Sequence, residues 1–144
     1  MFSWTSAIGS LVYIGCCVLA LRRGEQPERL VATAILLSYA ATLFVQDTHN
    51  LEATQYGLLV LDVLLLGVIF WSTFSSNRKW TLFAASFQLL AVLLHFAKHM
   101  DGTVDGWSYL TAEVIVGYGV TLSLLVGVFL EVRPASLTMH PGDA

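Results

Sequence analysis

Charged side chains are scarce in this sequence. Asp, Glu, Lys and Arg make up 12% of the 144 residues, about half the usual share in a soluble globular domain. Hydrophobic residues make up 56%, and the charges gather in short clusters that leave long apolar runs between them. With a net charge of −3 and no basic patch, nothing favours nucleic-acid binding. The composition predicts a polytopic, all-α membrane protein, because helices satisfy their own backbone hydrogen bonds where lipid cannot.

Motifs of common catalytic sites are also missing. There is no GxSxG, no CxxC and no glycine-rich phosphate-binding loop. The two cysteines, Cys16 and Cys17, are adjacent, and vicinal cysteines on a helix rarely bridge each other because their Cβ vectors diverge. We interpret them as small packing residues and expect a non-enzymatic protein.

Five apolar runs are long enough to cross a bilayer. The first lacks the basic start of a signal peptide, so we interpret it as an uncleaved helix. Pro27 and Glu28 suit the opening of the second helix. One transmembrane domain is expected over residues 1–133, followed by a short cytoplasmic tail over 134–144. The expected helices are about 2–21, 28–46, 53–74, 79–100 and 107–132.

The basic residues predict the orientation of this five-helix bundle. If the chain crosses the membrane five times, all the basic residues near the ends of the apolar runs except Lys98 fall on the same side. They are Arg22, Arg23, Arg29, Arg78, Lys79 and Arg133. The positive-inside rule then places the N-terminus outside and the C-terminus in the cytoplasm. We expect a multi-pass protein of a bacterial inner membrane, with the lipid bilayer and either further copies or other membrane subunits as partners.

Polar residues within the apolar runs are the candidates for a functional site. In the fourth run Gln88, His95 and His99 share one helical face. At 1.5 Å per residue, His95 lies roughly 7–8 Å below the outer surface, Asp62 roughly 10 Å and Glu113 roughly 9 Å. Nearer the surface we expect His49, Asp47 and Asp101. Because polar groups in hydrocarbon face protein or water, the pattern predicts a pocket open to the outside and closed toward the cytoplasm.

Several functions fit such a pocket. His95 and His99, spaced i and i+4, can present two imidazoles to one transition-metal ion, with Asp62 or Glu113 completing the site. His49 would be a further ligand, or one axial ligand of a haem paired with His95 or His99. Protons or cations bound at Asp62, Glu113 and His95 would instead make the protein a sensor or transporter.

The sequence favours a structural role. Asp62 or Glu113 would pair with His95 or Lys98 as a buried link between helices, in an accessory subunit or sensor of a membrane complex. The fifth run supports close helix contact, within the chain or between chains, because small residues recur in it every four positions. They are Gly119, Ser123 and Gly127.

Overall fold

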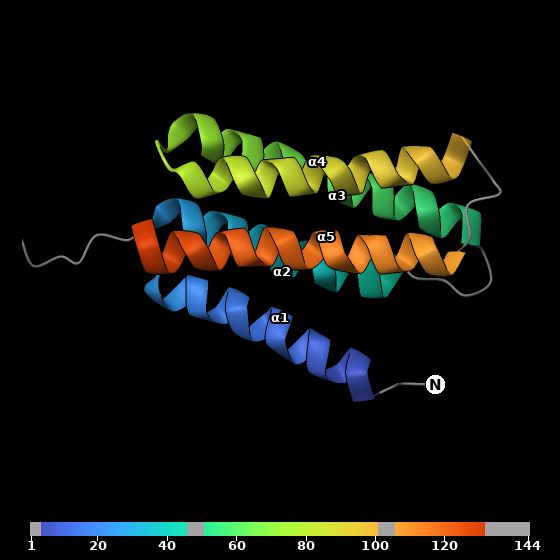
Figure 1. The fold of residues 1–144 in the computed structure, drawn as a ribbon, viewed down its shortest axis with the longest axis horizontal. Helices are drawn as coiled ribbons and strands as arrows, with labels where there is room; N and C mark the ends of the chain where they lie inside the picture. The colour runs from blue at the N-terminus through green and yellow to red at the C-terminus, as the bar shows by residue number, and fades with distance from the viewer. Residues whose placement is uncertain (1–3, 46–50, 101–105, 132–144) are drawn as a thin grey trace, which may run out of the picture.

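The computed structural model describes residues 4–45, 51–100 and 106–131, and every secondary-structure element in these ranges is a helix, which confirms the all-α part of the expected fold class. Five long helices run back and forth along one axis, and the last continues as a π-helix, η1 (Figure 1). Their bounds are α1 Trp4–Arg23, α2 Gln26–Val45, α3 Leu51–Ser75, α4 Lys79–Met100, α5 Gly106–Val126 and η1 Gly127–Glu131.

The helices form a ring in chain order. Each packs against the next, and α1 also packs against α5, which closes the ring. The α1–α2 and α3–α4 connections lie at one end of the bundle in Figure 1. We call this the arginine end, because it carries Arg22, Arg23, Arg29 and Arg78. Short connections between antiparallel neighbours explain the up-and-down order.

The α1–α2 connection is tight and its backbone groups are satisfied locally. Gly24 donates its backbone N–H to the carbonyl of Ala20 at 2.8 Å, where α1 ends. Glu28 Oε2 accepts the backbone N–H of Glu25 at 2.9 Å, so a side chain in the first turn of α2 caps that helix. Glu28 is fully buried. The sequence predicts only that it opens a helix, so its burial is a finding of the structure.

Trp80 joins three elements at the arginine end. Its indole Nε1 donates to Glu28 Oε1 at 2.9 Å, and both side chains are buried. A Cβ at Gly127 would lie 2.6 Å from the same indole ring, so only glycine permits η1 to approach Trp80 this closely. The contact fixes α2, α4 and η1 relative to one another.

The small residues of α5 lie where it meets α4. A Cβ at Gly119 would come within 2.5 Å of the Phe87 ring of α4. Ser123, one turn further on, is buried and donates its hydroxyl to the Gly119 carbonyl at 2.8 Å. Together with the Gly127–Trp80 contact, this makes the α4–α5 interface a close one within a single chain.

The outward surface of the bundle is apolar. Leu11, Leu37, Phe74, Phe83 and Leu122 are each more than half exposed. Soluble monomers rarely expose apolar surface this widely, so this surface indicates association with a membrane. Within the described residues, three helical stretches are long and apolar enough to cross a membrane. They are Tyr56–Ser75, Lys79–Met100 and Trp107–Leu130.

Candidate metal site between three helices

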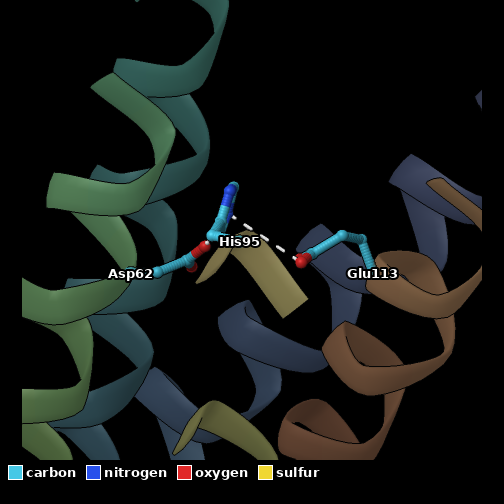
Figure 2. Close-up of side chains that lie close together, drawn as sticks. All are labelled: Asp62, His95 and Glu113. Atoms are coloured by element: carbon cyan, nitrogen blue, oxygen red, sulfur yellow. Dashed lines mark hydrogen bonds and ion pairs between the residues drawn. The ribbon is translucent and has the colours of Figure 1, made fainter. Parts of the chain in front are cut away.

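Asp62 of α3, His95 of α4 and Glu113 of α5 converge inside the bundle (Figure 2). One potential ligand atom from each lies within 4.8 Å of the other two. The His95 side chain is 6% exposed, that of Asp62 25% and that of Glu113 21%, so all three are largely shielded. We call these three residues the His/carboxylate group. Its three residues lie on three consecutive helices, so the packing of α3, α4 and α5 brings them together.

His95 is held at both ring nitrogens. Its Nε2 lies 2.8 Å from Asp62 Oδ2, and its Nδ1 lies 2.8 Å from the Tyr109 hydroxyl. An ionised carboxylate only accepts hydrogen bonds, so Nε2 carries the donated proton and the Tyr109 hydroxyl donates to Nδ1. A hydroxyl can also accept, so Tyr109 equally suits the other tautomer, in which Nδ1–H donates and Nε2 offers its lone pair to a metal ion.

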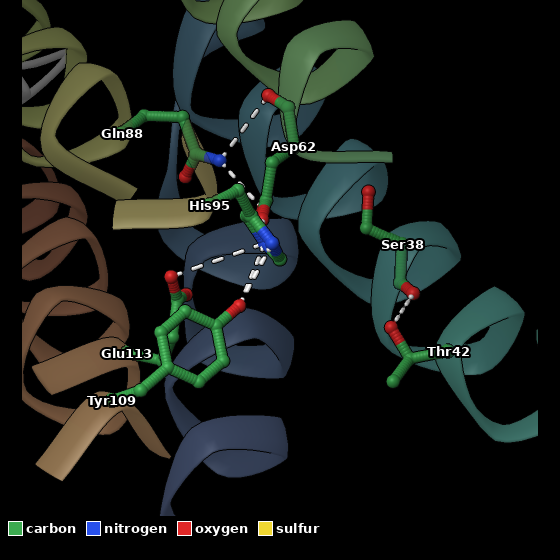
Figure 3. A network of polar contacts seen from close by, with 7 residues as sticks. All are labelled: Ser38, Thr42, Asp62, Gln88, His95, Tyr109 and Glu113. Atoms are coloured by element: carbon green, nitrogen blue, oxygen red, sulfur yellow. Dashed lines mark hydrogen bonds and ion pairs between the residues drawn. The ribbon is translucent and has the colours of Figure 1, made fainter. Parts of the chain in front are cut away.

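Gln88 orients the Asp62 carboxylate. Its amide Nε2 donates to Asp62 Oδ1 at 2.9 Å, with a longer contact of 3.3 Å to the Asp62 backbone carbonyl. Gln88 is 3% exposed, so water does not compete for this bond. The contact occupies Oδ1 and leaves Oδ2 directed at His95, as the polar network in Figure 3 shows. The same view shows Thr42 of α2, whose hydroxyl donates to the Ser38 carbonyl at 2.9 Å.

Glu113 has a buried oxygen without a hydrogen-bond partner. Among the residues that the structure describes, Oε1 of Glu113 is the buried side-chain oxygen or nitrogen for which no partner exists. It lies 3.9 Å from His95 Nε2, too far for a hydrogen bond. Leaving a buried acceptor unpaired costs about 1–3 kcal/mol, and more for a charged group. An orphaned carboxylate oxygen directed at a histidine is therefore a feature that requires a physical explanation.

The distances within the group suit a small divalent cation. Metal–nitrogen and metal–oxygen bonds of about 2.0–2.2 Å place two ligands of a tetrahedral ion about 3.3–3.6 Å apart. The His95–Asp62 separation of 2.8 Å and the His95–Glu113 separation of 3.9 Å lie on either side of that value. Shifts well within the range of side-chain motion would let all three atoms reach one ion.

The other predicted site residues lie elsewhere. His99, one turn beyond His95, is exposed, and its ring packs edge-on against Tyr56 with 5.7 Å between centroids. His99 is not one of the three residues whose potential ligand atoms lie within 4.8 Å of one another. The i, i+4 pair of His95 and His99 therefore does not form the site together. Asp47, His49 and Asp101 lie outside the described residues.

Tyr109 is the residue of this network that the sequence analysis missed. It is buried and lies four residues before Glu113, hence one turn earlier on the same face of α5. That i, i+4 spacing from an intramembrane carboxylate is the signal that would have identified it.

Comparisons with known protein families, with curated proteins and with solved structures found no match for this chain. The function proposed below is therefore inferred from the residues and their contacts alone.

Proposed function

We propose that this protein is a five-span integral membrane protein that holds one divalent transition-metal ion at Asp62, His95 and Glu113. Its role is non-enzymatic, as a sensor or accessory subunit of a membrane complex. The observation that carries the proposal is the buried, unpartnered Oε1 of Glu113 beside His95 and Asp62. An ion at this point would supply the missing partner.

Charge balance supports a divalent ion. In the protonation state that binds a metal, with both carboxylates ionised and the imidazole neutral, the group carries a charge of −2, which is costly away from water. A divalent cation neutralises that charge. One imidazole nitrogen with two carboxylate oxygens suits Zn²⁺, Mn²⁺ or Fe²⁺ better than the thiolate-binding Cu⁺.

The contacts around the group resemble the outer contacts of metal sites. Metal-binding histidines usually donate their second ring N–H to an oxygen, and metal-binding carboxylates are themselves hydrogen-bonded. In the tautomer whose Nδ1–H donates to Tyr109, His95 meets the first condition, and Gln88 fulfils the second for Asp62. These partners would hold the ligands in place before an ion arrives.

Five spans and the orientation are part of the proposal. α1 and α2 have 20 residues each, and at 1.5 Å per residue that is about 30 Å, the thickness of the hydrocarbon core. With the arginine end in the cytoplasm, the N-terminus is outside and the His/carboxylate group lies in the outer half of a bacterial inner membrane.

A second role is favoured by the contacts of His95. Both of its nitrogens already have protein partners, so the group also works as a polar link between α3, α4 and α5 without any ion. In that case the chain is an accessory subunit whose cluster only fixes helix packing. This role leaves the Glu113 oxygen unexplained, and therefore ranks second.

Metal content of the purified protein tests the proposal. The protein is incubated with Zn²⁺, Mn²⁺ or Fe²⁺, desalted, and analysed for bound metal per chain. The same is done for Asp62→Asn, His95→Gln and Glu113→Gln, with His99→Gln as the matched control one turn away. We expect about one ion per chain in wild type and His99→Gln, and loss of stoichiometric binding in the other three.

A metal-free wild type, or equal loss in His99→Gln, contradicts the metal site and favours the polar link. Elution of each variant as a single species on size exclusion shows that a loss of metal is not a loss of fold. An absorption spectrum of the same samples tests for haem, and a Soret band would contradict a site made of Asp62, His95 and Glu113.

A further inference from the structure

A groove of about 860 Å³ runs between α2 and α3 from the arginine end. Its lining changes character along its length. The polar part lies at the start of α2, with Glu25, Gln26 and Arg29. The apolar part includes Leu37 of α2 and Trp71 of α3, which are 66% and 70% exposed. The groove is thus polar at the arginine end and apolar along the rest of its length.

One face of α2 forms the floor of this groove. The lining residues of α2 from Gln26 to Leu37 recur at three- and four-residue intervals, the spacing of a single helical face. They cover 11 steps of 1.5 Å, hence about 16 Å along the helix axis. An extended chain lying along this face would touch polar groups first and apolar side chains afterwards.

Arg29 is positioned to bind an anion at the polar end of the groove. Its Nε donates to the Gly24 carbonyl at 2.9 Å, which fixes the guanidinium over the end of the groove. Within the described part of the chain, the two terminal nitrogens of Arg29 have no protein partner. The nearby acids are already engaged, because Glu25 pairs with Arg78 and Glu28 accepts from Trp80.

The net charge of the α1–α2 and α3–α4 connections and the residues beside them favours an anionic ligand. Residues 22–29 and 78–79 contain five basic side chains and two acidic ones, a difference of +3. Guanidinium groups bind phosphate oxygens in a bidentate manner, which suits the two available nitrogens of Arg29. Basic pockets between membrane helices on the cytoplasmic side are known to take anionic lipid headgroups.

We propose that this groove binds one anionic phospholipid of the cytoplasmic leaflet. The headgroup phosphate pairs with Arg29, and one acyl chain runs past Trp71 of α3 and Leu30 of α2 toward Leu37. The inference uses the membrane orientation of the proposed function but none of the metal ligands. Lipid binding and metal binding therefore fail independently.

Native mass spectrometry of the full chain, released from micelles with limiting phospholipid, tests the lipid site. The probes are phosphatidylglycerol, which is anionic, and phosphatidylcholine, which is zwitterionic. Wild type is expected to retain one phosphatidylglycerol in preference to phosphatidylcholine. Arg29→Gln should reduce this preference about fivefold, the effect of one cationic side chain near a lipid surface. Arg23→Gln, at the exposed end of α1 and outside the groove, is the control and should retain it.

A second variant pair tests the acyl part of the groove. Thr33 lines the groove and is exposed, so Thr33→Trp fills it and should abolish retention of the lipid. Thr111→Trp is the matched control on α5, because Thr111 is also exposed and also donates its hydroxyl to a carbonyl one turn earlier. Both variants keep their core side chains.

Equal retention of the two lipids by wild type, or unchanged preference in Arg29→Gln, overturns the lipid site. So does full retention by Thr33→Trp. Glu113→Gln, which removes a proposed metal ligand far from the groove, should retain phosphatidylglycerol like wild type. That result separates the failure of the metal proposal from the failure of the lipid proposal.

Discussion

Two polar clusters tie the helices together, and they differ in how completely their groups are paired. At the arginine end, the Glu28 carboxylate accepts from the Trp80 indole through one oxygen and from the Glu25 backbone through the other. In the His/carboxylate group, two acids share one imidazole and an oxygen of Glu113 has no partner. The first cluster is complete as a structural link, whereas the second leaves a carboxylate oxygen that a positive charge would satisfy.

Burial sharpens this comparison. Glu28 is completely buried, and so is its partner Trp80, at 1% exposure. Asp62 and Glu113 keep about a fifth to a quarter of their side-chain surface accessible. A closed link needs no access, whereas a site that takes up an ion from outside does.

The largest effect expected is on stability, from the cluster at the arginine end. Trp80→Ala should lower the free energy of unfolding by about 3–5 kcal/mol, as other large-to-small core substitutions do. It also leaves the buried Glu28 carboxylate without its indole donor. Thermal unfolding in detergent measures the change, with Trp71→Ala, whose side chain is 70% exposed, as the control expected to shift little. Equal losses in the two variants would show that Trp80 is not a structural anchor.

The next largest effect is stabilisation by bound metal, which is expected to depend on the His/carboxylate group and not on the cluster at the arginine end. Adding an ion at 100 times its dissociation constant should stabilise wild type by about 2.7 kcal/mol, because the ion binds the folded form alone. Glu113→Gln should show no such stabilisation, and Trp80→Phe should keep it despite a lower starting stability. The same unfolding assay with and without metal reports both. Metal-induced stabilisation that survives in Glu113→Gln would place the ion elsewhere.

Smaller effects are expected from the residues that orient the ligands. Gln88→Leu and Tyr109→Phe remove hydrogen bonds to Asp62 and His95 while leaving the three ligands in place. Each should weaken metal affinity about 10–100-fold without changing the number of ions bound at saturation. Competition with a chromogenic chelator measures the affinity. Unchanged affinity in both variants would mean that these contacts serve packing alone.

The smallest effect concerns the α4–α5 contact between the two clusters. Gly119→Ala forces a Cβ to within 2.5 Å of the Phe87 ring and should cost about 1 kcal/mol. The low value is expected because Phe87 is 37% exposed and has room to shift. Gly117→Ala is the matched control, since nothing lies within 4 Å of a Cβ there. Gly119→Ala should therefore be less stable than Gly117→Ala. The reverse order would contradict close packing at Gly119.

Much of the fold follows from the sequence because long apolar runs bounded by charged residues form helices whose length can be counted. The apolar runs predict five helices, and the observed bounds lie within two residues of the expected ones when η1 is counted with α5. Counting residues from the expected helix ends places Asp62, His95 and Glu113 at similar depths. This works because every α-helix rises by the same amount, about 1.5 Å per residue. The structure adds that all three face one another.

The details that sequence reasoning missed depend on helix rotation and on contacts between distant residues. His99 shares a face with His95, but the turn that carries it is exposed, and its ring contacts Tyr56 instead. Burial of Glu28 depends on Trp80, 52 residues away, whose indole provides its donor. No local pattern encodes such a pairing, because it arises only when α2 and α4 pack into the same bundle.

X-ray absorption of the Zn²⁺-loaded protein tests the metal site most directly, because it reports the ligand atoms themselves. A site at Asp62, His95 and Glu113 predicts only nitrogen and oxygen neighbours at about 2.0–2.2 Å, with the outer-shell scattering of a single imidazole. Glu113→Gln should change that spectrum or abolish it. Sulfur scattering at about 2.3 Å, which would implicate Cys16 and Cys17, or the signature of two imidazoles, would contradict the site.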